Sequence, residues 1–359
     1  MATEMIKIGS RLIGDGQPTY VVAEMAWSHD GSVDKAKVIV DGAADAGADA
    51  INLHLTDLPS YMVPFYGAGP GRVSGSQEQL EVYKYLDNIN LSFDDIEGLI
   101  AYAQGKGLAV STMCNDMESA IFATEKVNPD ILMLHPSCVG DEMLLRKVAS
   151  KGKPLVLYVG GLLLGEAEQA VLWAKEEGND QVILQHGFQS YPTAIEDNNL
   201  RYIETLKRLF GLPVAFGDHT DGGDPMAVIV PIMGVAMGAN VIEKHITPDR
   251  DAKGEDYESA LGPKEFKMFV DQLRQAEQTM GSPNWRPLSE RERNYRSVVR
   301  KRAVAKENIT AGSILTRENI TFKRCDIGFM PEEISGLFGN VAAGEDLAEN
   351  TPIVWERLK

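Results

Sequence analysis

The chain has 359 residues, a length typical of about two domains or of one large barrel with an added module. It carries 35 Lys and Arg residues against 52 Asp and Glu, and the resulting net charge of −17 argues against nucleic acid or an anionic membrane as the main partner. The chain has three cysteines without metal-type spacing, no apolar N-terminal run typical of a signal peptide, and no apolar stretch long enough to span a bilayer. We therefore expect a cytoplasmic protein.

From residue 19 to about 280, short apolar segments alternate with amphipathic helical ones. The eight predicted strands are β-branched or leucine-rich and nearly free of charge, as is typical of strands covered on both faces. They span residues 19–25, 50–55, 108–113, 131–135, 154–160, 181–186, 213–219 and 241–246. This count predicts a (β/α)₈ TIM barrel over residues 1–281. The alternative, a doubly wound open sheet, normally has fewer strands and opens into a Gly-rich turn that this sequence lacks.

Three further segments depart from the regular alternation. The connection 56–92 is much longer than a usual βα loop, and its Gly, Pro and aromatic residues fit either a substrate lid or a solvent-exposed excursion. The charged, Pro-containing stretch 282–297 predicts a linker. Residues 298–359 hold short apolar pieces between polar turns and predict a small, mostly β module.

All six histidines lie at or just after the C-terminal end of a predicted strand, the face that carries the active site of such a barrel. They are His29, His54, His135, His186, His219 and His245. Imidazoles on this face can bind a divalent cation or transfer protons.

His219 and His245 are the best metal candidates, because they follow neighbouring strands and are flanked by Asp218 and Glu243. A place in the barrel wall is the alternative for Glu243. Glu24 ends the first strand in an apolar setting that suits general acid/base catalysis or metal binding, with a buried structural carboxylate as the alternative.

Several phrases of the sequence resemble the N-acetylneuraminate (sialic acid) synthase family. They include AEMAWSHDGSVDKAKVIVDGAADAGADAINL, SYPTAIEDNNLRYIETLKRLFGLPVAFGDHT and GANVIEKHIT. The segment AVAKENITAGSILTRENITFKR resembles the antifreeze-like (SAF) domain that ends those enzymes. The resemblance spans almost the whole chain in the family's domain order.

The resemblance implies a metal-dependent barrel that condenses phosphoenolpyruvate with a sugar aldehyde to give a 2-keto sugar acid. The cation would be held by His219 and His245, with Mn²⁺ or Mg²⁺ expected and Zn²⁺ or Fe²⁺ as alternatives, and Glu24 would act at the reacting centre. Candidate substrate-binding residues that match or lie within the family's motifs are Asn52, Thr112, Ser137, His186, Gln189, Tyr191, Asp218, Lys244 and Asp256. The resemblance also implies a domain-swapped homodimer in which Arg300, or Arg302 as the alternative, reaches the partner's active site.

The departures from the family fall at positions that are expected to bind or convert the substrate. The second strand ends in Asn52-Leu53-His54 where a phrase like KFQ is expected, and Leu134–Val139 replaces a phrase like KIPSGE, so two anion-binding lysines are missing. Charge-assisted hydrogen bonds contribute about 1.5–3 kcal/mol each, so two losses predict a donor site that differs from the family's. His54 and His135 lie beside the positions where the two lysines are missing. They could bind the anion as imidazolium, enlarge the metal site, or form a new acid/base pair.

The sequence therefore predicts a sialic acid synthase-like, carbon–carbon bond-forming enzyme that uses phosphoenolpyruvate or a related keto acid. Its expected partner is a small anionic or sugar substrate, and His54, His135 and Glu24 are the catalytic candidates. The alternatives are a metal-dependent aldolase, lyase or isomerase acting on a sugar or keto acid, and a catalytically degenerate protein that binds sugar acids.

Overall fold

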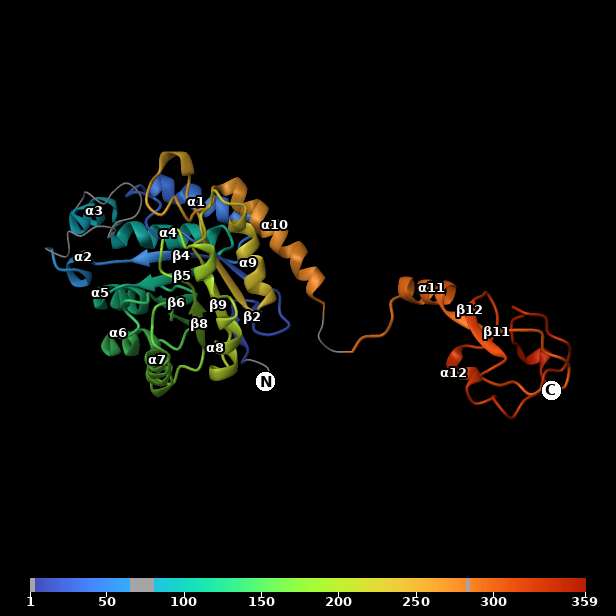
Figure 1. Cartoon of the computed structure of the whole chain (residues 1–359). Helices are drawn as coiled ribbons and strands as arrows, with labels where there is room; N and C mark the ends of the chain where they lie inside the picture. Colours follow the sequence, from blue (N-terminus) through green and yellow to red (C-terminus); the bar gives the residue numbers. More distant parts are fainter. Residues whose placement is uncertain (1–3, 65–80, 282–284) are drawn as a thin grey trace. The chain divides into compact units, whose positions relative to one another are not determined.

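The structure is a computed structural model that describes residues 4–64, 81–281 and 285–359 (Figure 1). The chain forms two compact units, Met1–Gly281 and Ser282–Lys359. In the first unit, eight parallel strands close into a barrel in which neighbours along the chain pair and the last strand pairs with the first. These strands are β3 (Tyr20–Glu24), β4 (Ala50–Leu55), β5 (Ala109–Cys114), β6 (Ile131–Leu134), β7 (Leu155–Tyr158), β8 (Val182–His186), β9 (Val214–Asp218) and β10 (Val241–His245). The predicted TIM barrel is confirmed, with strand boundaries that agree within two residues.

Helices surround the barrel, as Figure 1 shows. They are α1 (Val33–Ala46), α4 (Phe93–Gly105), α5 (Met117–Ile121), α6 (Glu142–Ala149), α7 (Leu164–Glu176), α8 (Tyr202–Phe210), α9 (Met226–Ala236) and α10 (Pro263–Met280). Local sequence sets their ends. Helix α1 begins after Ser32, whose side chain accepts a hydrogen bond from the Lys35 N–H, and it ends at Gly47, where φ is 79°.

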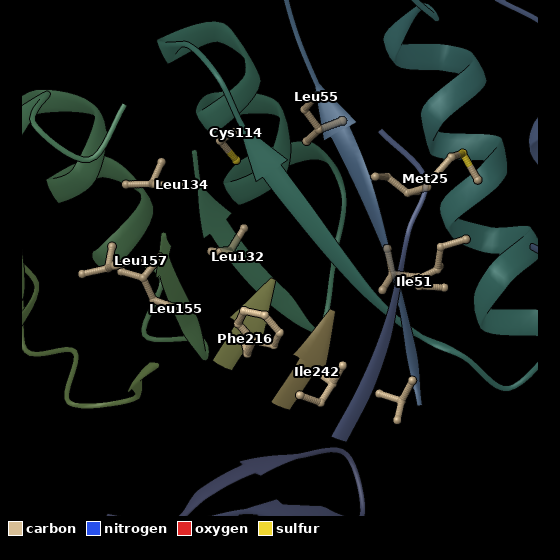
Figure 2. Close-up of a cluster of buried hydrophobic side chains, with 14 of the residues drawn as sticks. Met25, Ile51, Leu55, Cys114, Leu132, Leu134, Leu155, Leu157, Phe216 and Ile242 are labelled. Carbon is tan, nitrogen blue, oxygen red and sulfur yellow. The ribbon is translucent and has the colours of Figure 1, made fainter. Parts of the chain in front are cut away.

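The core has an outer and an inner layer, because successive side chains of a strand point to opposite faces. Figure 2 shows part of the outer layer, where side chains such as Ile51, Leu132 and Ile242 belong to the cluster that the surrounding helices complete. The inner layer includes residues near the N-terminal ends of the strands, such as Tyr20 and Val241. It is continued by Ile6, Ile8 and Ile13 of the hairpin β1 (Ile6–Ile8) and β2 (Arg11–Ile13). The hairpin therefore covers the N-terminal end of the barrel.

The long connection after β4 contains two short helices, α2 (Leu58–Tyr61) and α3 (Val82–Ile89). Residues 65–80, the Gly/Pro-rich centre of the segment predicted as a lid or an excursion, lie outside the described residues. The end of α3 is attached to the barrel. The indole N–H of Trp27 donates to Asn90 Oδ1 at 3.2 Å, and Asn90 Nδ2 donates to the Thr56 carbonyl at 2.8 Å.

The second unit has its own apolar cluster, built around Ala303, Leu315 and Ile353. Its antiparallel strands are β11 (Lys301–Ala305) and β12 (Ile320–Arg324), and α12 (Pro331–Ile334) follows them. Isolated bridges such as Ile309–Leu347 extend the β structure. The predicted mostly β module is confirmed.

The stretch predicted as a linker, residues 282–297, contains most of a helix, α11 (Glu290–Val299), which the sequence did not indicate. Ser289 and Glu292 form a reciprocal capping box at its start, and Arg286 pairs with Glu292 at 2.9 Å. No residue of this helix is buried. Seven of its ten residues are polar or charged, which is why its sequence resembles a charged linker.

A buried ion pair joins the last two barrel strands on the outer side of the barrel. Lys244 Nζ lies 2.7 Å from Asp218 Oδ2 and 3.0 Å from the Thr220 carbonyl, and both charged side chains are fully buried. Thr220 also donates to Asp218 through its hydroxyl and its backbone N–H. These hydrogen bonds therefore join β10 to β9 and to Thr220, which follows β9.

We expect Lys244→Ala to lower the free energy of unfolding of the barrel by about 3–5 kcal/mol, because the change leaves the Asp218 carboxylate buried without its partner. Urea unfolding of the purified chain would measure this loss. The matched control is Lys267→Ala, which removes an exposed pair with Asp271 and should change stability by less than about 1 kcal/mol. Equal effects of the two substitutions would contradict the assignment.

Candidate active site

A cavity of about 810 Å³ opens at the C-terminal ends of the barrel strands. The strand ends supply Glu24, His54, Tyr158, Glu243 and His245, while residues of α2 and α3 also line it. The described parts of the long connection thus contribute to the cavity, which favours the lid interpretation over a solvent-exposed excursion.

Glu24 and Glu243 form a buried pair of carboxyl groups in the cavity. Asn52 Nδ2 and the Ala26 N–H donate to the two oxygens of Glu24, and Gln185 Nε2 donates to Glu243. Burial, and then the negative charge of Glu243, raise the pKa of Glu24 well above its usual range, while burial raises the pKa of Glu243 to about 7. Two interacting carboxyl groups of this kind retain a proton near neutral pH, so the pair can act as an acid or a base.

Four histidines face the same cavity: His54, His135, His219 and His245. Burial is the main cause that lowers their pKa values, to about 3 for His54, to about 4 for His135 and His219, and well below the usual range for His245. All four rings are therefore neutral near pH 7.

His219 and His245 fit the role of metal ligands. The rings lie 5.1 Å apart between centroids, and His219 Nδ1 donates to the Phe188 carbonyl at 2.8 Å, which leaves its Nε2 lone pair available. His245 Nδ1 is buried without a hydrogen-bond partner, 4.0 Å from Asp256 Oδ2. Within the described ranges, no three His, Cys, Asp or Glu side chains form a group that could hold a metal ion. A cation here would need oxygen ligands from substrate or water besides the two imidazoles.

His54 and His135 lie nearer the carboxyl pair and the loop after β6. His54 Nε2 is 3.5 Å from Glu24 Oε1, its Nδ1 has no hydrogen-bond partner, and its ring packs edge-to-face on Trp27. His135 Nδ1 lies 2.8 Å from the Ser137 hydroxyl oxygen. His54 therefore lies against the carboxyl pair, and His135 lies against the loop after β6.

Asp256 and Tyr191 complete the described wall next to His245. Asp256 has a φ of 60°, a left-handed conformation that is strained for a residue with a side chain and that often occurs at functional sites. Its neighbour Glu255 accepts a hydrogen bond from the Tyr85 hydroxyl at 2.6 Å, which ties α3 to the loop after β10. Ser137 and Tyr191 also line the cavity, as the sequence predicted.

Other predicted site residues lie elsewhere, and strand alternation is the reason. Thr112 faces the helix layer beside Val110 and Cys114, whereas Met113 faces the cavity. Asp218 and Lys244 form the outer ion pair described above. These three substrate-binding assignments are corrected.

His186 and Asn52 are corrected too, for two different reasons. His186 Nε2 donates to the Asn198 carbonyl and its ring packs on Tyr202 and Phe216, so it is a structural histidine of the outer layer. Asn52 faces inward but is fully buried beneath Glu24, to which it donates. His29 is also buried outside the cavity lining.

Arg300 lies in the second unit, where both terminal nitrogens pair with the Glu332 carboxylate at 2.6 Å. Arg302, the alternative, donates to the Cys325 and Gly328 carbonyls. Of the two, Arg300 has the more accessible partner, because the Glu332 side chain is 56% exposed.

Sequence reasoning missed Tyr158 and Gln185, both of which face into the barrel. Tyr158 ends the apolar segment LVLY, so it was counted as part of a buried strand. Its place at a strand end, next to glycines at 160 and 161, was the available signal.

The fold and the cavity define a (β/α)₈-barrel protein with an acid/base pair and clustered imidazoles at its C-terminal mouth. Residues 39–284 match the model of the NeuB family, and residues 300–359 match that of the SAF domain. The chain therefore belongs to the NeuB family and carries a C-terminal SAF domain, which confirms the resemblance found in the sequence.

Several of the named relatives are synthases. N,N'-diacetyllegionaminic acid synthase of Legionella pneumophila is 29% identical, over 96% of each chain. An uncharacterized protein of Methanocaldococcus jannaschii is 34% identical, over 99% of each chain. The crystal structure of N-acetylneuraminic acid synthetase from Leptospira borgpetersenii superposes with a TM-score of 0.71 and 26% identity, covering 83% of this chain and 98% of that one. No helix among the described residues is both long and apolar enough to cross a membrane.

We expect the buried histidines to lower the free energy of unfolding as pH decreases from 6.5 toward 4, against the opposite contribution of Glu24 and Glu243, whose raised pKa values let the folded chain take up protons in the same range. Unfolded histidines take up protons near pH 6.5, whereas burial keeps His54, His135 and His219 neutral down to about pH 4. Each such histidine contributes up to about 1.4 kcal/mol per pH unit. Urea unfolding at a series of pH values gives the slope of the free energy of unfolding against pH. His54→Gln should make this slope shallower by an amount that corresponds to nearly one proton. Identical slopes would show that His54 is not held neutral by the fold.

Proposed function

We propose that this protein is a metal-dependent synthase that joins phosphoenolpyruvate or a related keto acid to a sugar aldehyde, forming a 2-keto sugar acid. The observation that carries the proposal is the placement of two neutral imidazoles, His219 and His245, in one cavity with the proton-retaining pair Glu24 and Glu243. The named synthases among the relatives support the reaction class.

His219 and His245 would hold the divalent cation, for which we propose Mn²⁺ or Mg²⁺, with Zn²⁺ or Fe²⁺ as alternatives. When bound, a divalent cation polarises a carbonyl oxygen as a Lewis acid. The hydrogen bond from His219 to the Phe188 carbonyl fixes the ring tautomer, and burial keeps both rings in the neutral form that a ligand requires.

Proton transfer would fall to Glu24 and His54. The Ala26 N–H and the Asn52 amide orient the Glu24 carboxyl, and His54 places a ring nitrogen 3.5 Å from it. The raised pKa of Glu24 favours its protonated form, which can donate a proton. Asp256, Tyr191 and Ser137 offer polar groups for the hydroxyls of a sugar, and the hydroxyl of Ser137 contacts His135.

We further propose that the donor site is altered. The described residues that line the cavity include no lysine or arginine, although six carboxyl groups do. Because phosphate groups are usually held by charged donors, positive charge for phosphoenolpyruvate would have to come from the bound cation or from Arg300 of a second chain. The same observation favours, as a second candidate, an aldolase or lyase acting on an unphosphorylated keto acid.

A homodimer and a cytoplasmic location are also part of the proposal. The exposed Glu332 holds the Arg300 guanidinium in the structure of one chain, and an anionic group of a second chain could replace it. This would let Arg300 serve the partner's cavity, as the resemblance implies.

We expect the purified chain with Mn²⁺ to form a 2-keto sugar acid from N-acetylmannosamine or a related sugar and either phosphoenolpyruvate or pyruvate. Mass spectrometry would detect the product, and phosphate release would distinguish the donors. Glu24→Gln should lower kcat by at least about 10²-fold, because it removes the group that transfers a proton. Absence of product with both donors across a panel of sugars would contradict the proposal.

Metal binding gives a test that does not need turnover. Isothermal titration of metal-free protein with Mn²⁺ should show binding that His219→Ala weakens by about tenfold or more, because one of the two protein ligands is lost. His186→Asn is the matched control, since His186 lies outside the cavity lining, and it should leave Mn²⁺ affinity unchanged. If the His219 variant and the wild type bind Mn²⁺ equally, the proposed metal site is wrong.

A further inference from the structure

One wall of the cavity combines a helix and a loop that are far apart in the sequence. Tyr85 of α3 lines the cavity, and so do Glu255 and Asp256 from the loop after β10. The Tyr85 hydroxyl donates to Glu255 Oε2 at 2.6 Å. Asp256 Oδ2 in turn lies 4.0 Å from Nδ1 of the metal-ligand candidate His245. The hydrogen bond from Tyr85 therefore reaches the direct neighbour of a carboxyl group that lies beside the proposed metal site.

Glu255 is held at its backbone as well as at its side chain. Its N–H donates to Asp30 Oδ1 at 3.0 Å, and its carbonyl accepts a hydrogen bond from the Ser28 hydroxyl at 3.1 Å. These two contacts attach it to the loop after β3, whereas the hydrogen bond from Tyr85 attaches it to α3. The Tyr85 hydroxyl is therefore the contact by which α3 controls the orientation of the Glu255 side chain.

The backbone on both sides of Glu255 has a conformation that its surroundings must maintain. Asp256 has a φ of 60° and Lys253 a φ of 51°, both in the left-handed region. Gly254 lies so close to Asp30 that a Cβ atom on the glycine would be 2.5 Å from Asp30 Oδ2. Left-handed residues with side chains persist only where neighbouring contacts hold them. The direction of the Asp256 carboxyl group therefore depends on how firmly Glu255 is held.

The polar groups of this wall indicate which substrate it binds. Glu255 and Asp256 offer carboxyl oxygens, and burial and then the charge of Glu255 raise the pKa of Asp256 well above its usual range. Asp30 adds a carboxylate nearby, which pairs with Lys35 at 2.7 Å. Carboxyl oxygens accept hydrogen bonds from the hydroxyl groups of a sugar, whereas they repel an anionic keto acid. The wall therefore suits the sugar and not the acid.

Helix α3 has other attachments that do not use the Tyr85 hydroxyl. Its three buried side chains, Val82, Leu86 and Ile89, belong to one apolar cluster. Asn90, directly after the helix, is bonded to the barrel as described above. Removal of the Tyr85 hydroxyl should therefore break one contact to the loop after β10 and leave the helix in place.

We infer that Tyr85 is a positioning residue for the sugar substrate, because its hydrogen bond to Glu255 holds Asp256 in the conformation that receives the sugar hydroxyl groups. The inference rests on the proposed function for the identity of that substrate. It assigns to α3 a role in the affinity for the sugar, and none in the affinity for the acid with which the sugar is joined.

The first test is the binding of N-acetylmannosamine and of phosphoenolpyruvate to the full chain with Mn²⁺, each measured by isothermal titration. Tyr85→Phe keeps the ring and removes a donor to a carboxylate, so it should weaken sugar binding by about tenfold and change phosphoenolpyruvate binding by less than about twofold. Tyr83→Phe is the matched control. Tyr83 lies on the same helix and packs against the same apolar cluster, but it is not among the described residues that line the cavity. This variant should bind both probes as wild type does.

The second test asks whether Tyr85 acts through Glu255. Glu255→Ala should weaken sugar binding by about tenfold or more, and adding Tyr85→Phe to it should cause less than about twofold further loss, because the two residues act as one unit. An equal loss from Tyr85→Phe in both backgrounds would show that the Tyr85 hydroxyl contacts the sugar directly. That result would overturn the positioning role.

Turnover separates this inference from the proposed function. In the condensation assay, Tyr85→Phe should raise the KM for the sugar by about tenfold with kcat nearly unchanged, as expected when binding alone is lost. Unchanged sugar binding in Tyr85→Phe, an equal loss of sugar and phosphoenolpyruvate binding, or no sugar binding by wild type would each overturn the inference. Product formation by wild type together with any of these results would keep the proposed function. Conversely, sugar binding that depends on Tyr85, without product from either donor, would support the inference and contradict the synthase proposal alone.

Discussion

The two-residue alternation of side chains along each barrel strand governs the chemistry of this protein. On β10, Glu243 and His245 face the cavity, whereas Lys244 between them faces the helices and pairs with Asp218. A single strand therefore supplies a proton-retaining carboxyl group and a metal-ligand candidate on one side, and a buried cation that joins it to β9 on the other. Since the barrel is closed, a shift of register in one strand would disturb both faces at once.

Desolvation then sets the protonation of the groups that face inward. Burial raises the pKa values of Glu24 and Glu243 and lowers those of the four cavity histidines. The described lining consequently holds neutral imidazoles and carboxyl groups that share a proton, with no lysine or arginine among them. In such a lining, positive charge has to come with a bound cation, with the substrate or with a second chain.

The barrel itself could be predicted from the sequence, because strands covered on both faces are short, apolar and unbroken by charge. The cavity groups Glu24, His54, His219 and His245 could also be predicted, since each stands at or just after a strand end. The face of the barrel to which each strand side chain points could not be predicted. Thr112 and His186 occupy the expected strands but face the helices, and a one-residue difference decides this. Tyr158 was missed because an aromatic residue in an apolar segment has no polar pattern, and α11 because most of its residues are polar and none is buried.

The most direct test of the account is anomalous diffraction from crystals of the full chain soaked in Mn²⁺. The account predicts a manganese peak at the C-terminal mouth of the barrel, with the imidazole nitrogens of His219 and His245 as its protein ligands and with Glu24 and Tyr158 facing the same space. A peak held by other residues, or no peak in the cavity at saturating Mn²⁺, would contradict a metal-dependent condensing site.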